Sequence, residues 1–344
     1  MAATPTAQRA PFALGLFIAL VSAATFGSSG TFGSSLLATG WSPGAIVTAR
    51  ISGAAVLMLV PAVIAMRGRW HLLRRNLGRI VVYGLFAVAG CQFAYFMAVE
   101  GLSVGVALLL EYLAPVLIVG WVWLRHGRRP TRLTLLGVAA ALTGLVLVLD
   151  VTSGAKLDVG GVLWGLLAAV GLVIFFLVAA DQDEALPPIS FAGGGLVVGA
   201  LSLVAVAAVG LLPMHATTAP VTLAGMSAPW WVPVLELAVV AGAVSYATGI
   251  AAARLLGGTV ASFVGLSEVL FAVVLAWLVV GESMSPSQVL GGVAVLAGVV
   301  AVKLGERPGS APALPCDDVD TALATVAEPD ASTGGELAET VAVH

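Results

Sequence analysis

The sequence predicts an all-α membrane protein of ten transmembrane helices, arranged as two inverted five-helix repeats. Three observations lead to this prediction. Of the 344 residues, 60% are hydrophobic and only 10% are charged, and the mean hydropathy of +1.07 lies far outside the range of a soluble domain. Apolar runs of helical length recur along the chain, and the second half repeats the first at a fixed spacing.

Ten apolar segments are each close to the length of about 20 residues that a helix needs to cross the hydrocarbon core. The segments lack the alternation of a lipid-facing β-barrel, and a helix satisfies its own backbone polar groups where water is absent. The expected spans cover residues 12–37, 43–66, 80–101, 104–124, 133–151, 160–180, 189–212, 231–255, 259–280 and 286–304.

The basic residues favour one orientation of these spans. Of the 15 Lys and Arg residues, Arg50 lies inside a span and Lys156 falls in a loop on one side, whereas all the others fall on the opposite side. Because Lys and Arg accumulate in cytoplasmic loops, we expect both termini to be cytoplasmic and the protein to lie in the inner (plasma) membrane as a multi-pass protein.

The expected organisation has five parts. A cytoplasmic N-terminal segment (1–11) precedes the first five-helix repeat (12–151), and a linker (152–159) leads to the second repeat (160–304). The C-terminal tail (305–344) is rich in Pro, Ala, Thr, Asp and Glu and has no apolar period. This composition predicts a disordered, acidic tail.

The internal repeat appears when residues 97–150 are placed on residues 251–304, an offset of 154 positions. No gap is needed, and the most informative matches are Trp123 with Trp277, Gly127 with Gly281, Gly137 with Gly291, and Gly144 with Gly298. A unit of five spans crosses the membrane an odd number of times, so the second copy is inserted upside down. Inverted repeats of this kind share a site near the midplane of the bilayer.

Three local patterns carry a resemblance to a known family. Arg50 stands early in the second span in TARISGAAVL, Pro115 stands in the fourth in YLAPVLIVGWVWL, and Gly281-Glu282 stand in LVVGESMSPSQVLGGVAVLAGV. With these patterns the chain resembles the EamA family of the drug/metabolite transporter superfamily over roughly residues 12–304. In the other half of the chain, Val269 replaces the Pro and Arg128 replaces the acid. The resemblance implies a ten-helix fold that exports or imports metabolites such as amino acids or drugs.

Two carboxyl groups are candidates to bind a substrate or a proton. Glu111 and Glu268 each approach the middle of a span, and Glu268 corresponds to Ala114, one helical turn from Glu111. The two side chains therefore lie on similar faces of equivalent helices. A charge at the centre of a span costs about 2.5–3.5 kcal/mol on insertion scales, which favours a role in a central cavity. Packing through a hydrogen bond to a neighbouring helix is the alternative.

Other polar groups within the spans are weighed in the same way. Arg50 is positioned to bind a substrate carboxylate or one of the glutamates through two parallel hydrogen bonds, and a structural ion pair is the alternative. Pro115 is expected to bend its helix beside Glu111. Candidates for the cavity lining, with interhelical hydrogen bonds as the alternative, are Gln92, Tyr95, Tyr112 and Tyr246.

Three further acidic residues and one repeated motif are expected to have simpler roles. Glu100, Glu236 and Glu282 stand near helix ends and are expected to reach the membrane interface. The motif TFGSS occurs at 25–29 and again at 31–35. Its small residues favour close helix packing, and a moving gate is the alternative.

Several kinds of function lack the residues that they need. The chain has no G-x-x-x-x-G-K-[ST] motif, so ATP hydrolysis is not expected. Its four histidines stand in expected loops or the tail without a Cys/His cluster, so no metal or cofactor is expected. The basic loops follow the topology rule, which makes membrane lipids their expected partners and gives no support to nucleic acid.

The sequence therefore predicts a secondary transporter that exports a small-molecule substrate by alternating access. Coupling of this export to protons is one hypothesis. Amino acids, related metabolites and drugs are the substrate classes considered. The alternative is a membrane-embedded enzyme acting on a lipid or prenyl substrate, for which Asp181-Gln182-Asp183-Glu184 is the nearest acidic cluster. The sequence does not indicate an oligomeric state.

Overall fold

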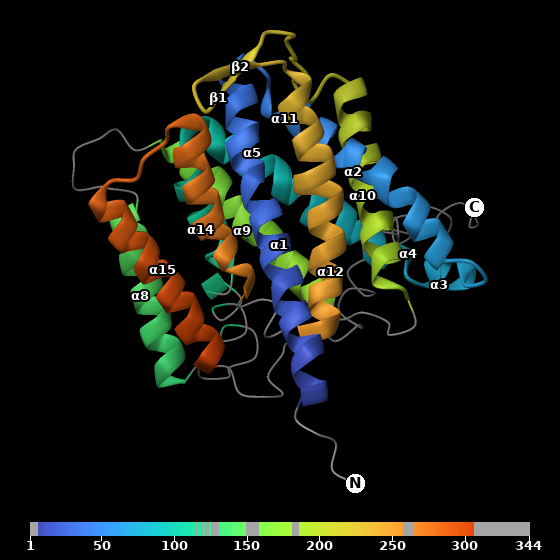
Figure 1. Ribbon diagram of the computed structural model, residues 1–344, viewed down its shortest axis with the longest axis horizontal. Coiled ribbons are helices and arrows are strands. Elements are labelled where there is room, and N and C mark those ends of the chain that lie inside the picture. Colours follow the sequence, from blue (N-terminus) through green and yellow to red (C-terminus); the bar gives the residue numbers. More distant parts are fainter. Residues whose placement is uncertain are drawn as a thin grey trace, which may run out of the picture.

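The computed structural model is a bundle of long helices with a small β-hairpin at one end and the start of the first helix at the other (Figure 1). We call these the hairpin end and the N-terminal end. The structure describes residues 6–114, 116, 117, 120, 124, 131–148, 158–180, 186–256 and 264–305. Pro115, the Asp181–Glu184 cluster, most of the linker and nearly all of the tail lie outside these residues.

Apolar helices occupy the positions of most of the expected spans, and for the fourth, residues 104–124, the structure describes a helix over Val104–Glu111. The helical segments long and apolar enough to cross a membrane are Phe12–Leu37, Pro43–Ala65, Leu77–Gly101, Ile189–Ala208 and Trp231–Gly249. Shorter apolar helices cover Arg132–Val148, Val159–Phe175, Ser267–Val280 and Pro286–Val302. A mostly helical membrane fold is thus confirmed.

The helices follow one another in two series. The first half contains α1 (Thr6–Leu37), α2 (Pro43–Ala65), α3 (Trp70–Arg75), α4 (Leu77–Val82), η1 (Tyr83–Gly90), α5 (Cys91–Gly101), α6 (Val104–Glu111) and α8 (Arg132–Val148). The second contains α9 (Val159–Ala180), α10 (Pro188–Ala208), α11 (Trp231–Leu235), η3 (Glu236–Val244), α12 (Ser245–Leu256), α14 (Ser267–Leu275), η4 (Ala276–Val280) and α15 (Pro286–Gly305).

Helix ends follow local sequence signals. At the start of α2, the Ser42 side chain accepts a hydrogen bond from the Ala45 N–H, and Pro43 occupies the first helical position, where its missing N–H costs nothing. The expectation that the seventh span reaches residue 212 was wrong, because α10 ends at Ala208 and Gly210 follows with φ of 76°. Glycine favours this left-handed conformation just after a helix.

Two of the long helices contain a wider π-helical segment at the same place in each repeat. The segment η1 lies between α4 and α5, and η3 lies between α11 and α12. Adding the offset of 154 to Tyr83–Gly90 gives 237–244, which coincides with η3 almost residue for residue. Turns of π-helix are rare, and those that interrupt an α-helix often lie at functional sites. Their shared position therefore indicates a structural feature common to both halves.

The last helix of each half packs against its counterpart through glycines, and α8 and α15 lie side by side in Figure 1. A Cβ atom on Gly137 would lie 2.6 Å from the Gly298 carbonyl oxygen, and a Cβ atom on Gly144 would lie 2.5 Å from that of Gly291. Along the contact, residue numbers increase in α8 while they decrease in α15, so these equivalent helices are antiparallel. Each glycine contact is therefore reproduced when the two halves are exchanged.

The contacts of neighbouring helices are likewise equivalent in the two halves. Helix α1 packs on α12 and α14, as α9 packs on α5 and α6. Likewise α2 packs on η3, and α10 packs on η1. Such paired contacts are the arrangement expected of two inverted units around an axis in the membrane plane.

The fold is not purely α-helical, because β1 (Val221–Leu223) and β2 (Met226–Ala228) form an antiparallel hairpin. Its turn has positive φ at Ala224 (50°) and Gly225 (75°), as a two-residue hairpin turn requires. No strand was expected here, because each strand is only three residues long. The hairpin N–H of Ala224 donates to the Val279 carbonyl of η4 at 2.6 Å.

The segment before the hairpin holds the loop between α1 and α2. Trp41 donates from Nε1 to the Thr217 carbonyl at 2.9 Å, and Thr217 donates from Oγ1 to the Thr39 carbonyl at 3.0 Å. The Trp41 ring also lies 6.0 Å from the Trp230 ring. This segment therefore covers the hairpin end of the bundle and joins both halves there.

Candidate functional site

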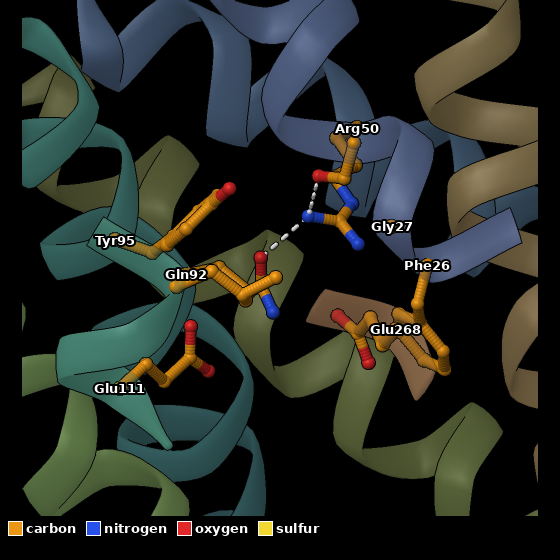
Figure 2. A pocket seen from close by; sticks show the side chains of 9 residues that line it. Phe26, Gly27, Arg50, Gln92, Tyr95, Glu111 and Glu268 are labelled. Carbon is orange, nitrogen blue, oxygen red and sulfur yellow. Dashed lines mark hydrogen bonds between the residues drawn. The ribbon is translucent and has the colours of Figure 1, made fainter. Parts of the chain in front are cut away.

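A cavity between the two halves brings together most of the candidate residues. Its empty volume, which includes space open to the outside, is about 280 Å³, and it is lined by Phe26, Gly27, Ser29, Arg50, Gln92, Tyr95, Leu108, Glu111 and Glu268. Figure 2 shows the carboxyl groups of Glu111 and Glu268 directed into the same space from opposite sides, with Arg50 and Gln92 above them in that view. Helices α1, α2, α5 and α6 of one half and helix α14 of the other therefore share one polar cavity.

Arg50 is 3% exposed and is held by neutral groups. Its Nη1 donates to Ser29 Oγ and to Gln92 Oε1, each at 2.5 Å, and Nη2 donates to the Ala241 carbonyl at 3.0 Å. Its guanidinium carbon also lies 6.0 Å from the centre of the Phe96 ring. Among the described residues no carboxylate forms an ion pair with Arg50, so the structural ion pair considered from the sequence is not formed here.

The third hydrogen-bond acceptor of Arg50 is the Ala241 carbonyl, which lies in the π-helical segment η3. Hydrogen bonds in a π-helix run to the fifth residue along, which breaks the regular α-helical pairing of carbonyls. The Ala241 carbonyl accepts from both Arg50 Nη2 and the Ser245 hydroxyl, the latter at 2.6 Å. The π-helical segment of the second half thus positions the cation of the first half.

Glu111 is the last residue of α6 and is 8% exposed. Its Oε1 accepts from the Cys91 thiol at 3.4 Å, while the same thiol lies 3.3 Å from the Ala168 carbonyl of α9. A thiol is a weak donor, so the carboxyl group is only weakly held and remains available to a ligand in the cavity. Pro115, which was expected to bend the helix beside it, lies outside the described residues.

Glu268 approaches the cavity from the second half at the start of α14. Tyr112 donates its hydroxyl hydrogen to Glu268 Oε2 at 2.9 Å, and the Gly265 carbonyl lies 3.2 Å from the same hydroxyl. Tyr112 directly follows Glu111 in the chain. One segment of the first half therefore supplies a cavity carboxyl group and also a donor to the carboxyl group of the second half.

The other expected lining residues divide into two groups. Gln92 and Tyr95 of α5 line the cavity, and Gln92 accepts from Arg50 as described above. Tyr246 does not line it; its ring packs edge-on against Phe26, with centroids 5.1 Å apart. The structure therefore places Tyr246 in an aromatic contact, and neither Tyr246 nor Tyr112 is among the lining residues.

The first TFGSS motif both packs and lines the cavity. A Cβ atom on Gly27 would lie 2.8 Å from the Glu268 carbonyl oxygen, so the glycine lets α1 approach the backbone of α14 closely. Phe26 and Ser29 stand on either side of this contact and line the cavity. Sequence reasoning identified the small residues but did not select Phe26, Ser29 or Leu108 as lining residues.

Two acidic residues differ from the interfacial roles expected of them. Glu236 accepts a hydrogen bond from Ser28 at Oε1, and its Oε2 is buried without a partner among the described residues. Glu282 Oε2 accepts from the Val104 N–H at 3.0 Å and so caps the start of α6. Burial raises the pKa of Glu282 above its ordinary value, and the hydrogen bond from Val104 opposes that rise.

The described residues contain no cluster of three or more His, Cys, Asp or Glu side chains that could hold a metal ion. The polar groups of the cavity are instead a cation, two carboxyl groups, an amide, a phenol and a hydroxyl. Groups of these kinds are suited to charged or hydrogen-bonding small molecules. Two related halves with a polar cavity between them are the architecture of a membrane transporter.

Comparison with known proteins agrees with this class. The sequence profile of the EamA-like transporter family matches residues 13–150 and 159–304. The chain belongs to this family, whose two copies fall on the two halves described above. It is a multi-pass protein of the inner membrane, and its family places it among transporters rather than with the membrane-embedded enzyme considered as the alternative.

Two individual proteins illustrate the relationship. The "uncharacterized inner membrane transporter YicL" of Salmonella typhimurium is 24% identical over 243 residues, which cover 68% of this chain and 75% of the relative. A solved crystal structure covers 85% of this chain and 97% of its own chain, with a TM-score of 0.55 and 19% sequence identity. The second likeness concerns the fold alone.

Proposed function

We propose that this protein is a secondary transporter that exports a small metabolite by alternating access, with the cavity between the halves as its binding site. The observation that carries the proposal is the convergence of Arg50 with Glu111 and Glu268, which come from both halves, on one cavity. Charged side chains within a membrane are costly and mark binding sites or ion pathways. A site built by both halves is also the one that their relative movement can expose to either side.

The proposed topology has ten spans and places both termini in the cytoplasm. Its support is the basic residues on one side of the predicted spans, together with the antiparallel packing of α8 and α15. The proposed repeats are residues 12–151 and 160–304, joined by the linker 152–159. Both proposed repeats overlap the two matches to the family profile.

The proposed substrate carries both a carboxylate and an amine, as an amino acid does. Arg50 has N–H donors on Nε and Nη2 that no described residue uses, and guanidinium groups bind carboxylates through such paired donors. Glu111 and Glu268 stand across the cavity and are suited to an ammonium group. Gln92, Tyr95 and Tyr112 add hydrogen-bonding groups, whereas an organic cation would need the two glutamates alone.

Proton coupling is part of the proposal, because a buried carboxyl group exchanges a proton more readily than it accepts an uncompensated charge. Glu111 and Glu268 line the same cavity, and two like charges that share a site repel each other. A proton shared by this pair therefore competes with a cationic group of the substrate.

The test is flux in proteoliposomes. Amino acids and organic cations are screened with and without an imposed pH gradient, using the wild-type protein, Glu111→Gln, Glu268→Gln and the control Glu100→Gln, whose side chain is exposed at the end of α5. We expect gradient-driven flux in the wild type and the control, and loss of it in both cavity variants. Flux that is unchanged in both variants would mean that these carboxyl groups are structural, and absence of any flux would contradict the proposed function.

A further inference from the structure

Glu236 stands in the same π-helical segment as the backbone group that holds Arg50, although it does not line the cavity. It is the first residue of η3, and the carbonyl of Ala241, five residues later, accepts a hydrogen bond from Arg50 Nη2 at 3.0 Å. Five residues make about one turn of a π-helix. Glu236 therefore stands one turn away from the backbone group that holds the Arg50 guanidinium.

Both groups have hydrogen-bonding capacity that the structure leaves unused. Glu236 Oε2 is buried and has no partner among the residues that the structure describes, while Oε1 accepts from Ser28. An arginine has five N–H donors, and Arg50 uses three of them on described residues. A buried polar atom without a partner costs free energy. The unused carboxylate oxygen and the unused donors are complementary to each other.

The surroundings of Glu236 contain few other ionisable groups. The elements packed against η3 are α1, α2, α11 and α12. Helix α2 contributes Arg50, α12 contributes Tyr246 and Arg254, α11 contributes none, and α1 contributes Arg9 near its far end. Among the described residues, Arg50 is the charged group that acts electrostatically on Glu236. Arg50 is therefore the positive charge that would stabilise an ionised Glu236.

We propose that Glu236 is a proton-binding site whose ionised form replaces the substrate carboxylate on Arg50. This inference rests on the proposed function, in which that carboxylate binds Arg50. When Glu236 holds a proton it is neutral, and the free donors of Arg50 are open to the substrate. When Glu236 releases the proton to the aqueous phase, its carboxylate takes the same donors and the substrate carboxylate leaves.

Ser28 and Ser29 separate the two partners in the present state. Ser28 donates to Glu236, whereas Ser29 accepts from Arg50. The adjacent hydroxyl groups on α1 therefore hold the carboxyl group and the guanidinium apart. In the proposed step, α1 moves relative to η3 and these contacts are exchanged for a direct ion pair, which links the proton on Glu236 to the packing of the two halves.

The first test needs no substrate. The melting temperature of the purified full-length protein is measured at about pH 5 and about pH 9 for the wild type, Arg50→Gln, Glu236→Gln and the double variant. At the higher pH we expect the two substitutions to be non-additive by about 2 °C or more, because only an ionised Glu236 pairs with Arg50. At the lower pH we expect additivity. Additive effects at both pH values would overturn the inference.

The second test uses a mixture of the twenty tritiated L-amino acids as the transport probe. In wild-type proteoliposomes we expect the apparent KM to rise by about tenfold per pH unit where Glu236 ionises, since one proton is exchanged for one bound carboxylate. Glu236→Gln is expected to lose this slope, Glu236→Asp to keep it, and the control Glu100→Gln to behave as the wild type. A slope retained in Glu236→Gln would overturn the inference.

The two tests separate this inference from the function on which it rests. If the wild type takes up none of the probe, the proposed function fails. The melting temperatures still decide whether Glu236 and Arg50 form a pair that depends on pH.

Discussion

At the scale of single residues, Arg50 is the group on which the cavity is centred. It makes three hydrogen bonds to three different helical elements of the bundle, through Ser29, Gln92 and the Ala241 carbonyl. A lysine carries the same charge but has a single nitrogen and cannot match the planar fork of a guanidinium. The site therefore depends on the shape of this side chain as well as on its charge.

Arg50→Lys is expected to weaken transport strongly. We predict a rise in KM of about tenfold or more, because the loss of one charge-assisted hydrogen bond to a ligand costs about 1.5–3 kcal/mol. Uptake kinetics in proteoliposomes measure the change. Arg67→Lys is the matched control, because Arg67 is exposed in the loop after α2. An unchanged KM in Arg50→Lys would show that the guanidinium does not bind the substrate.

Tyr112→Phe tests the contact between the two halves at Glu268. Removing the hydroxyl leaves Glu268 Oε2 without its 2.9 Å donor, and we predict a loss of about 0.5–1.5 kcal/mol in stability, or more if the carboxyl group is ionised. Thermal unfolding in detergent measures it. Tyr95→Phe is the control, because the Tyr95 hydroxyl makes no hydrogen bond to a described residue. Equal effects of the two substitutions would contradict this assignment.

Sequence reasoning selected residues whose cost is visible in the sequence, and the structure places three of them around one cavity. An ionisable residue in an apolar span stands out, and Arg50, Glu111 and Glu268 were selected for that reason. Phe26 and Leu108 were not selected, because an apolar residue in an apolar helix carries no such signal. Glu236 was placed at the interface because it stands near the start of its span, and only the π-helical geometry shows that it is close to Arg50.

At the scale of helices, close packing of the last helix of each half joins the repeats. The backbones of α8 and α15 approach so closely that a methyl group on Gly144 would lie 2.5 Å from the Gly291 carbonyl oxygen and 2.7 Å from the Val295 nitrogen. Neither of these atoms can move without displacing its helix. The repeated glycines found in the sequence thus have a direct physical role.

Gly144→Ala is therefore expected to destabilise the protein by about 1–3 kcal/mol, the usual cost of an overpacked contact. The melting temperature in detergent is the measurement. Gly78→Ala in α4 is the control, because a methyl group there meets no atom within 4 Å and alanine has the higher helix propensity. A Gly144→Ala variant as stable as the wild type would contradict the observed packing of α8 on α15.

Glu282 gives the start of α6 a dependence on pH. Its pKa is raised by burial, so the folded protein holds this proton more tightly than the unfolded chain does. The resulting stabilisation is present at low pH and is lost as pH rises through the raised pKa. Relative to Glu282→Gln, we expect the wild type to lose stability as pH increases above the ordinary carboxyl range. A constant difference in melting temperature across pH would contradict this expectation.

At the scale of the whole molecule, the two halves make equivalent helix contacts, and this repetition explains why the fold was largely predictable. A repeat of five spans is visible in the sequence, and an odd number of spans requires inversion. The positions of most spans followed from apolar length alone. The hairpin at β1 and β2 was not predicted, because six paired residues outside the apolar spans are too few to produce a recognisable strand pattern.

The proposed topology is testable by thiol labelling in intact cells. In a variant lacking the native cysteines, a cysteine at Gly68 lies in the basic loop after α2, and one at Ala224 lies in the hairpin turn. We expect a membrane-impermeant reagent added outside to label Ala224→Cys and to leave Gly68→Cys unlabelled until the cells are opened. The reverse result would invert the topology.

The central claim is that one cavity, shared by both halves, is the substrate site and opens to each side in turn. The most direct measurement is labelling of Leu108→Cys, placed in the cavity wall of a protein otherwise free of cysteine, from either face of oriented vesicles. We expect an impermeant thiol reagent to reach this position from both faces, and a transported substrate to slow the reaction from both. Reaction from one face only, at a rate that saturating substrate does not change, would contradict it.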